Sequence, residues 1–192
     1  MDEIINQQEA TRNSLRKQFD NLVEYGEING GWGSLLSLKN LEEDVFLVDS
    51  LWQEVKVKGA DDSVHNFNKA EEAVEAINAK VIELNELAED IQGRFALMHK
   101  IGLSKKKDAG VVMGTLRDNN FSKLDEKEIE VLGGLLAKMG KFKESYENWV
   151  KWRKGNFNEL NKFLKAVVSS KTMYKKSLIH GRPAIGAADY NK

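Results

Sequence analysis

The sequence predicts an all-α fold, an elongated antiparallel helical bundle or coiled coil with a long central helix and an extended C-terminal tail. Three separate stretches repeat apolar residues at spacings of three and four, the pattern that keeps one face of a helix against a partner helix. The 192 residues include one proline, Pro183, which favours long helices because proline breaks a helix interior. Charged residues make up 31 % of the chain, as expected when every helix turns one face to water.

The first helix is expected at residues 2–25, where the acidic side chains of Asp2 and Glu3 suit the positive end of a helix dipole. Four glycines within residues 26–33 then predict a loop. Trp32 lies in this loop. We favour the interpretation that it fills one end of the bundle, because tryptophan buries a large area; the alternative is an exposed anchor for a partner.

The central helix is expected at residues 68–102, after a helix at 34–58 whose wide apolar stripe could touch more than one neighbour. Asn68 is its expected N-cap, and Glu71 completes a capping box. Nine apolar residues follow the heptad spacing without interruption: Ala70, Val74, Ile77, Val81, Leu84, Ala88, Ile91, Phe95 and Met98.

Residues 101–120 lose this periodicity and predict a long connection, with a short turn or strand at 111–113. A second capping box, from Ser122 to Asp125, indicates the start of a helix at 122–154.

The end of the chain is expected to form a shorter helix at 156–170. The preceding helix could break at Gly140 or at Gly155, and we favour a kink near Gly155. Residues 1–170 therefore form the predicted bundle domain, and residues 171–192 an extended basic tail.

Charge is divided unevenly along the chain. Residues 1–135 carry a net charge of −10 and residues 136–192 one of +9. The favoured interpretation pairs the C-terminal lysines with the acidic central helix, in the same chain or in a second copy. The alternative is a nucleic-acid surface, in which Trp152 stacks on bases. Ten residues are candidates for contact with a partner or with nucleic acid: Trp32, Lys151, Trp152, Arg153, Lys154, Lys171, Tyr174, Lys175, Lys176 and Arg182.

Catalytic and metal-binding signatures are missing from the sequence. The chain has no cysteine, which excludes disulfides, thiolate catalysis and cysteine-ligated metals. Its three histidines are far apart and lack a metal-ligand spacing. Residues 134–141 depart from a phosphate-binding loop in glycine spacing and in lacking the Ser or Thr that binds magnesium. We therefore expect neither an enzyme nor a cofactor.

These patterns favour a non-enzymatic structural or assembly protein, a helical-bundle subunit that docks on copies of itself or on other proteins in a larger particle, such as a virion or a secretion-type apparatus. The alternative function is a nucleic-acid-binding module that acts through the basic C-terminal third. The chain lacks a signal peptide pattern and a membrane-length apolar run, so we expect a soluble intracellular protein, cytoplasmic or part of a particle assembled there.

Overall fold

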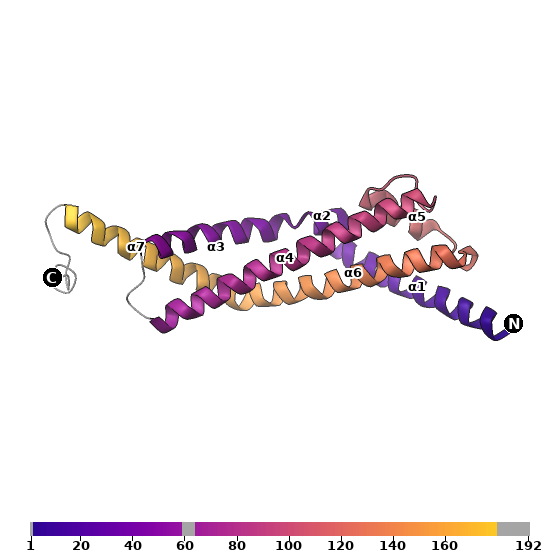
Figure 1. Ribbon diagram of the computed structural model, residues 1–192, viewed down its shortest axis with the longest axis horizontal. Helices are drawn as coiled ribbons and strands as arrows, with labels where there is room; N and C mark the ends of the chain where they lie inside the picture. Colours follow the sequence, from indigo (N-terminus) through magenta and orange to yellow (C-terminus); the bar gives the residue numbers. More distant parts are fainter. Residues whose placement is uncertain (1, 59–63, 180–192) are drawn as a thin grey trace. The chain divides into compact units, whose positions relative to one another are not determined.

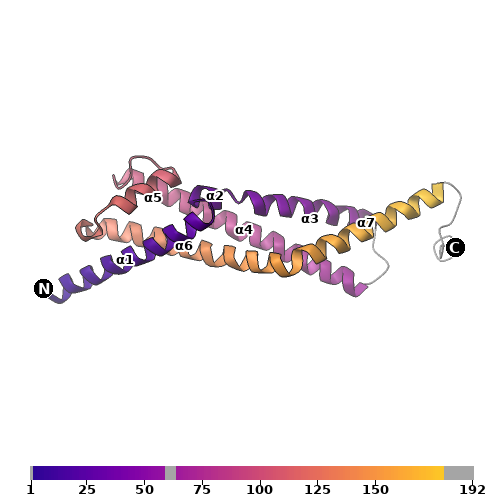
Figure 2. The ribbon, with the colours of Figure 1, turned by 180° about the vertical axis from the view of Figure 1, so that it is seen from behind.

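The computed structural model describes residues 2–58 and 64–179, and all regular structure in this part of the chain is helical (Figures 1 and 2). The elements, in order, are α1 (Asp2–Ile28), α2 (Trp32–Ser37), α3 (Lys39–Lys58), α4 (Val64–Lys100), α5 (Ala109–Asp118), the 3-10 turn η1 (Phe121–Lys123), α6 (Glu126–Trp152), the π-helical segment η2 (Arg153–Phe157) and α7 (Asn158–Ile179). The predicted all-α helical bundle is confirmed; its elongation and coiled-coil character stay predictions.

The helices form two compact units. Unit 1 comprises Met1–Lys39 and Val81–Asn148, and unit 2 comprises Asn40–Lys80 and Trp149–Lys192. The boundaries fall inside α4 and α6, so each of these long helices contributes one part to each unit.

Unit 1 is built on antiparallel packing of α4 against α6. Asp90 of α4 pairs with Lys138 of α6, and one turn further along α4 the Arg94 guanidinium lies against Gly134. The residue numbers rise on one helix as they fall on the other, so the two helices run in opposite directions, as Figure 1 shows. Gly134 makes room for this contact, because the Arg94 side chain occupies the space where a Cβ would stand.

Unit 2 has a separate apolar core between α3, the first half of α4, and η2 with α7. Its buried members are Val48, Trp52, Val55, Ala70, Val74, Ile77, Phe157, Leu160, Leu164 and Val167. The predicted seam of α4 thus serves both units. Eight of its nine residues are buried, and Val81, which stands at the boundary between the units, is partly buried.

The glycine-rich segment after the first helix is shorter than predicted. α1 continues through Gly26, which is buried, and ends in two overlapping hydrogen bonds: Gly31 N–H donates to the Gly26 carbonyl and Gly30 N–H to that of Glu27. Gly30 has φ +83°, the left-handed conformation that this helix end requires and that glycine adopts without strain.

The expected helix at 34–58 is two helices. α2 starts at Trp32, and Leu38 then adopts a left-handed conformation with φ 53° before α3 begins. Leu38 is buried. The turn therefore goes with the packing of this side chain in the core, since leucine is not a residue that signals a turn in the sequence.

Two predicted capping boxes are wrong. α4 begins at Val64, which places Asn68 inside the helix. The box before α6 lies one turn later than expected: Glu128 N–H donates to Asp125 Oδ1 at 2.8 Å, and Asp125 N–H donates to Glu128 Oε1 at 3.0 Å. Asp125 therefore takes the N-cap role that the sequence pattern assigned to Ser122.

The predicted connection at 101–120 contains helix α5 instead of a turn or strand. Asp108 caps it by accepting a hydrogen bond from Val111 N–H at 3.4 Å. Val112 and Leu116, one turn apart, are its buried residues. So short an apolar repeat, with glycines beside it, gives little periodic signal.

The C-terminal region departs from prediction in two ways. The kink expected near Gly155 is a π-helical segment that joins α6 to α7 without a break, and α6 runs unbroken through Gly140. α7 then continues to Ile179, so the expected extended tail is wrong for residues 171–179. Neither glycine nor proline occurs in that stretch, so nothing stops the helix. The rest of the predicted tail lies outside the described residues.

Candidate functional site

The ten predicted contact residues are divided between different settings. Five have described side chains: Trp32, Lys151, Trp152, Arg153 and Lys154. Lys171, Tyr174, Lys175 and Lys176 lie on the last turns of α7, where only the backbone is described, and Arg182 lies outside the described residues.

Trp32 lies inside unit 1, in agreement with the internal interpretation. Its side chain is 4 % exposed, and its indole Nε1–H donates to the Leu22 carbonyl at 2.8 Å. The indole ring also contacts the rings of Tyr25 and Phe142. Tyr25 belongs to the same packed cluster: burial of its hydroxyl, and after it the charge of Glu147, raises the pKa of Tyr25 to about 12. Trp32 is therefore part of an aromatic core and does not present a surface anchor.

Arg153, at the start of η2, is bound within unit 2. Its Nε donates to Asp44 Oδ2 at 2.6 Å and its Nη2 to Asp44 Oδ1 at 3.3 Å, the two-bond geometry that suits guanidinium and carboxylate. The same guanidinium lies 4.9 Å from the centre of the Phe157 ring. This arginine joins η2 to α3. The neighbouring Lys151 and Lys154 are exposed.

Trp152 is partly buried beside a surface groove of about 330 Å³ in unit 2. The groove is lined by Lys69, Ala70 and Ala73 of α4 together with Trp152, Asn156, Glu159, Leu160 and Phe163. The Asn156 side-chain amide donates to the Trp152 carbonyl at 3.0 Å within the π-helical turn. Such turns occur often at functional sites, which makes this groove a candidate, with an apolar floor and a polar rim.

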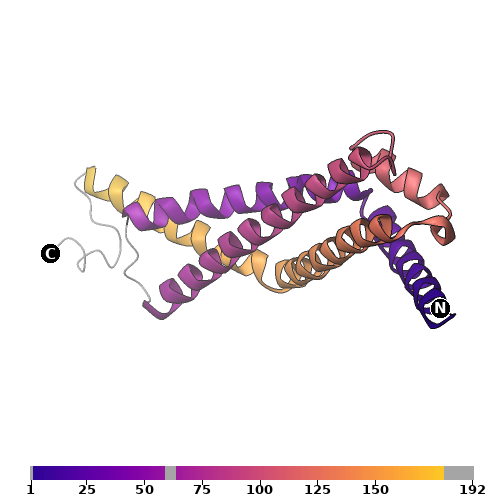
Figure 3. The ribbon, with the colours of Figure 1, turned by 45° about the vertical axis from the view of Figure 1, so that its right-hand side comes forward.

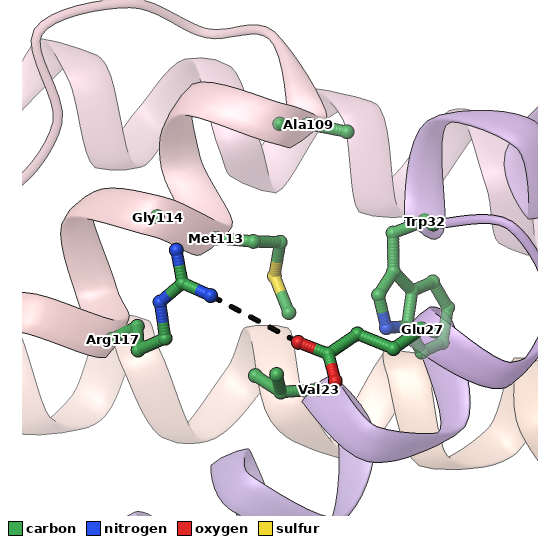
Figure 4. Close-up of a pocket in the computed structure, with 10 residues that line it drawn as sticks. Val23, Glu27, Trp32, Ala109, Met113, Gly114 and Arg117 are labelled. Carbon is green, nitrogen blue, oxygen red and sulfur yellow. Dashed lines mark ion pairs between the residues drawn. The ribbon is translucent and has the colours of Figure 1, made fainter.

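A smaller cavity of about 180 Å³ lies in unit 1 between α1, α2 and α5 (Figure 4). Glycines and the side chains of Val23, Trp32 and Met113 form much of its lining. Arg117 Nη1 and Glu27 Oε1 approach to 3.9 Å at its edge, and both side chains are well exposed. An exposed ion pair of this length contributes little to stability, so it does not hold the edge of the cavity firmly closed.

The first half of α1 is the feature that the sequence analysis missed. Residues 2–14, here called the arm, contain no buried side chain, and Ile4 and Ile5 are 61 % and 56 % exposed. Figure 3 shows the start of α1 extending past the other helices of unit 1. The sequence does carry a sign of this exposure, because the polar residues Gln8 and Arg12 interrupt the helical spacing of the apolar residues Ile5, Leu15, Phe19 and Leu22.

A second groove, here called the end groove, lies where α4 ends and α6 begins. It encloses about 450 Å³ and is lined by Leu97, Lys100, Ile101, Asp125, Lys127 and Glu128. Leu97 is 36 % exposed. The arm leaves the rest of unit 1 close to this groove, because Arg12 donates two hydrogen bonds, at 2.7 and 3.2 Å, to the carbonyl of Leu124, the residue before Asp125.

Lys138 and Asp90 in unit 1 give a direct example of the predicted charge pairing between α4 and the C-terminal half. Lys138 Nζ lies 3.1 Å from Asp90 Oδ2. A hydrogen bond from Lys138, with the nearby Arg94 guanidinium, lowers the pKa of Asp90 from its ordinary value of 3.8. Stability from this pair is therefore present above the ordinary carboxylate pKa and is lost as the pH falls through the lowered value.

Replacing Lys138 by methionine should lower the free energy of unfolding at pH 7 by up to about 1 kcal/mol, the range of partly exposed pairs. The deficit should shrink as the pH falls from the ordinary carboxylate pKa through the lowered pKa of Asp90, because the protonated side chain no longer forms the ion pair. Urea unfolding at a series of pH values measures this. Lys141→Met, at an exposed position of the same helix, is the control. A deficit that stays constant down to pH 2 would show that Lys138 acts through packing alone.

No family model matches the chain, and no curated protein or solved structure is significantly similar to it. Within the described residues, no group of three or more histidine, aspartate or glutamate side chains is placed to hold a metal ion. No helix in this part of the chain is both long and apolar enough to cross a membrane.

Proposed function

We propose that the chain is a non-enzymatic structural or assembly subunit that associates with copies of itself as part of a larger particle. The observation that carries the proposal is the arm of α1. It is helical over residues 2–14, buries none of its side chains and exposes the adjacent isoleucines Ile4 and Ile5.

Burial of such side chains is the main source of favourable free energy when proteins associate. Covering one large apolar side chain contributes about 1.5–3 kcal/mol. The arm is the unpacked end of the longer helix α1, and most helical stability in proteins comes from packing of an apolar face, so a protein surface that covers the arm would stabilise it. Phe46 on α3 is also exposed, at 76 %, but it lies in unit 2 and outside the arm.

Light scattering coupled to size-exclusion chromatography, from low micromolar to near-millimolar protein, tests the proposal. We expect the average mass to rise with concentration above that of a single 21.7 kDa chain. A mass that stays at one chain over the whole range would overturn the proposal.

Binding to nucleic acid is the alternative outcome. The structure commits Arg153 to Asp44 but leaves Lys151 and Lys154 exposed. Fluorescence anisotropy with a labelled single strand and a labelled duplex at low salt would detect such binding. Affinity that falls steeply with added salt, together with a monomeric protein, would favour this alternative over assembly.

A further inference from the structure

We propose that the arm of each copy packs into the end groove of a second copy, so that two chains exchange their arms around a two-fold axis. This inference rests on the proposed self-association and names the surfaces that perform it. The partner is a second copy of this chain, and the contact combines two apolar patches with opposite charges.

The arm offers an apolar and acidic surface. Ile4 and Ile5 are its large exposed apolar side chains. They follow Asp2 and Glu3, and no basic residue occurs before Arg12. The arm therefore presents two isoleucines beside carboxylates at the start of a helix.

The end groove offers the complementary surface. Leu97 and Ile101 supply apolar contact, and Lys100 and Lys127 are exposed cations among its lining residues. The groove also contains Asp125 and Glu128, but each of these carboxylates accepts a hydrogen bond from the other residue's backbone N–H at the start of α6. The lysines are thus the side chains left to meet a carboxylate from outside.

The geometry favours a second copy over the same chain. Leu15 anchors α1 in the core, and Ile5 lies ten residues before it along the helix, a rise of about 15 Å. The arm cannot turn back onto its own end groove without breaking this continuous helix, and the structure leaves Ile4, Ile5 and Leu97 exposed.

The positions of the arm and the groove also suit a closed dimer. The bonds from Arg12 to the Leu124 carbonyl place the base of the arm one residue from Asp125 of the groove. Two copies that face each other at this end can each give an arm and receive one. The same surface then appears on both sides of the contact, which is the condition for a two-fold dimer that closes and does not extend into a fibre.

Single substitutions at the two surfaces test the inference. Ile5→Glu and Leu97→Glu should each weaken self-association at least tenfold, measured by sedimentation equilibrium. Because both side chains are exposed, the variants should keep the wild-type circular dichroism spectrum. Phe46→Ser, at an exposed apolar position outside the arm and the groove, should associate as the wild type does.

Charge reversal gives a test that does not depend on apolar burial. Glu3→Lys should weaken association, and the same protein carrying Lys127→Glu in addition should recover it, because the charges are exchanged across the contact. Failure of the second change to restore association would contradict the proposed partner of the arm.

Cross-linking shows directly whether the contact is between copies. The chain contains no cysteine, so two introduced thiols are unambiguous. Mixing Asn6→Cys protein with differently tagged Lys100→Cys protein should give a disulfide-linked heterodimer. Mixing Asn6→Cys with Gln53→Cys, at an exposed site on α3, should give no such heterodimer.

The outcomes separate the two proposals. A monomeric wild type overturns both self-association and arm exchange. A wild type that associates, while Ile5→Glu and Leu97→Glu associate equally well, overturns arm exchange alone and assigns the contact to another surface, such as the one around Phe46.

Discussion

Replacement of Trp32 by alanine is expected to lower the free energy of unfolding by about 3–5 kcal/mol, the cost of deleting a large buried aromatic side chain. The indole is 4 % exposed and contacts two other rings of unit 1. Its removal leaves a cavity among Leu22, Tyr25 and Phe142 that these side chains cannot fill. Urea unfolding followed by circular dichroism measures the loss.

Two further variants show which part of the indole matters. Trp32→Phe keeps most of the apolar ring but removes the hydrogen bond from the indole to the Leu22 carbonyl, so about 0.5–1.5 kcal/mol of the loss should remain. Gly26→Ala keeps Trp32 but places a methyl group in contact with the indole, which should cost about 1–3 kcal/mol through overpacking.

Gly33→Ala is the matched control, because a Cβ there meets nothing within 4 Å. Its stability should stay at the wild-type level or rise slightly, since alanine favours a helix more than glycine does. If Trp32→Ala unfolds at nearly the wild-type urea concentration, the aromatic cluster is not the core of unit 1.

The apolar seam of α4 shows why the fold class could be predicted from the sequence. Eight of the nine residues of the repeat are buried. A repeat of this length shows which face of the helix is buried, even when the partner that covers it is unknown. The pattern could not reveal that Ala70 and Met98 belong to the cores of different units, because the spacing is the same on both sides of Val81.

The features that were missed depend on tertiary contacts rather than on local pattern. Leu38 adopts a left-handed conformation although leucine gives no turn signal. Gly26 lies inside a helix, where the Trp32 ring occupies the space that a Cβ would need. The end groove forms only in three dimensions, since its lining residues Leu97 and Lys127 are far apart in sequence. Of the predicted contact residues, Lys151 and Lys154 are exposed and Trp152 is partly buried. Trp32 is buried in unit 1, and Arg153 is exposed but bound to Asp44.

Arg16 is expected to be the polar residue whose loss costs unit 1 most. Its guanidinium donates to the carbonyls of Leu116 and Asn119 through Nη1 and to that of Arg117 through Nη2, at 3.1–3.4 Å. It therefore binds the end of α5, where the last carbonyls of a helix lack intrahelical donors and the dipole favours a cation. The guanidinium also lies 5.0 Å from the centre of the Phe121 ring.

Arg16→Met should lower the free energy of unfolding by about 2–3 kcal/mol, because it removes hydrogen bonds from a charged donor while keeping an apolar side chain over the rings. Arg16→Lys should recover less than half of this loss, since a single ammonium cannot span three carbonyls as the planar guanidinium does. Lys17→Ala, at the exposed neighbouring position, should change stability by less than about 0.5 kcal/mol.

Hydrogen exchange distinguishes this role from a general loss of stability. In Arg16→Met the amides of α5 should exchange faster than those of α6 by more than the global change in unfolding free energy allows, because the end of α5 loses its donors while the α4–α6 pair keeps its contacts. Uniform acceleration across both helices, or a lysine variant as stable as the wild type, would show that Arg16 contributes only bulk and charge. Lasting selective protection of α5 in the methionine variant would instead show that Val112 and Leu116, not the guanidinium, hold this helix in place.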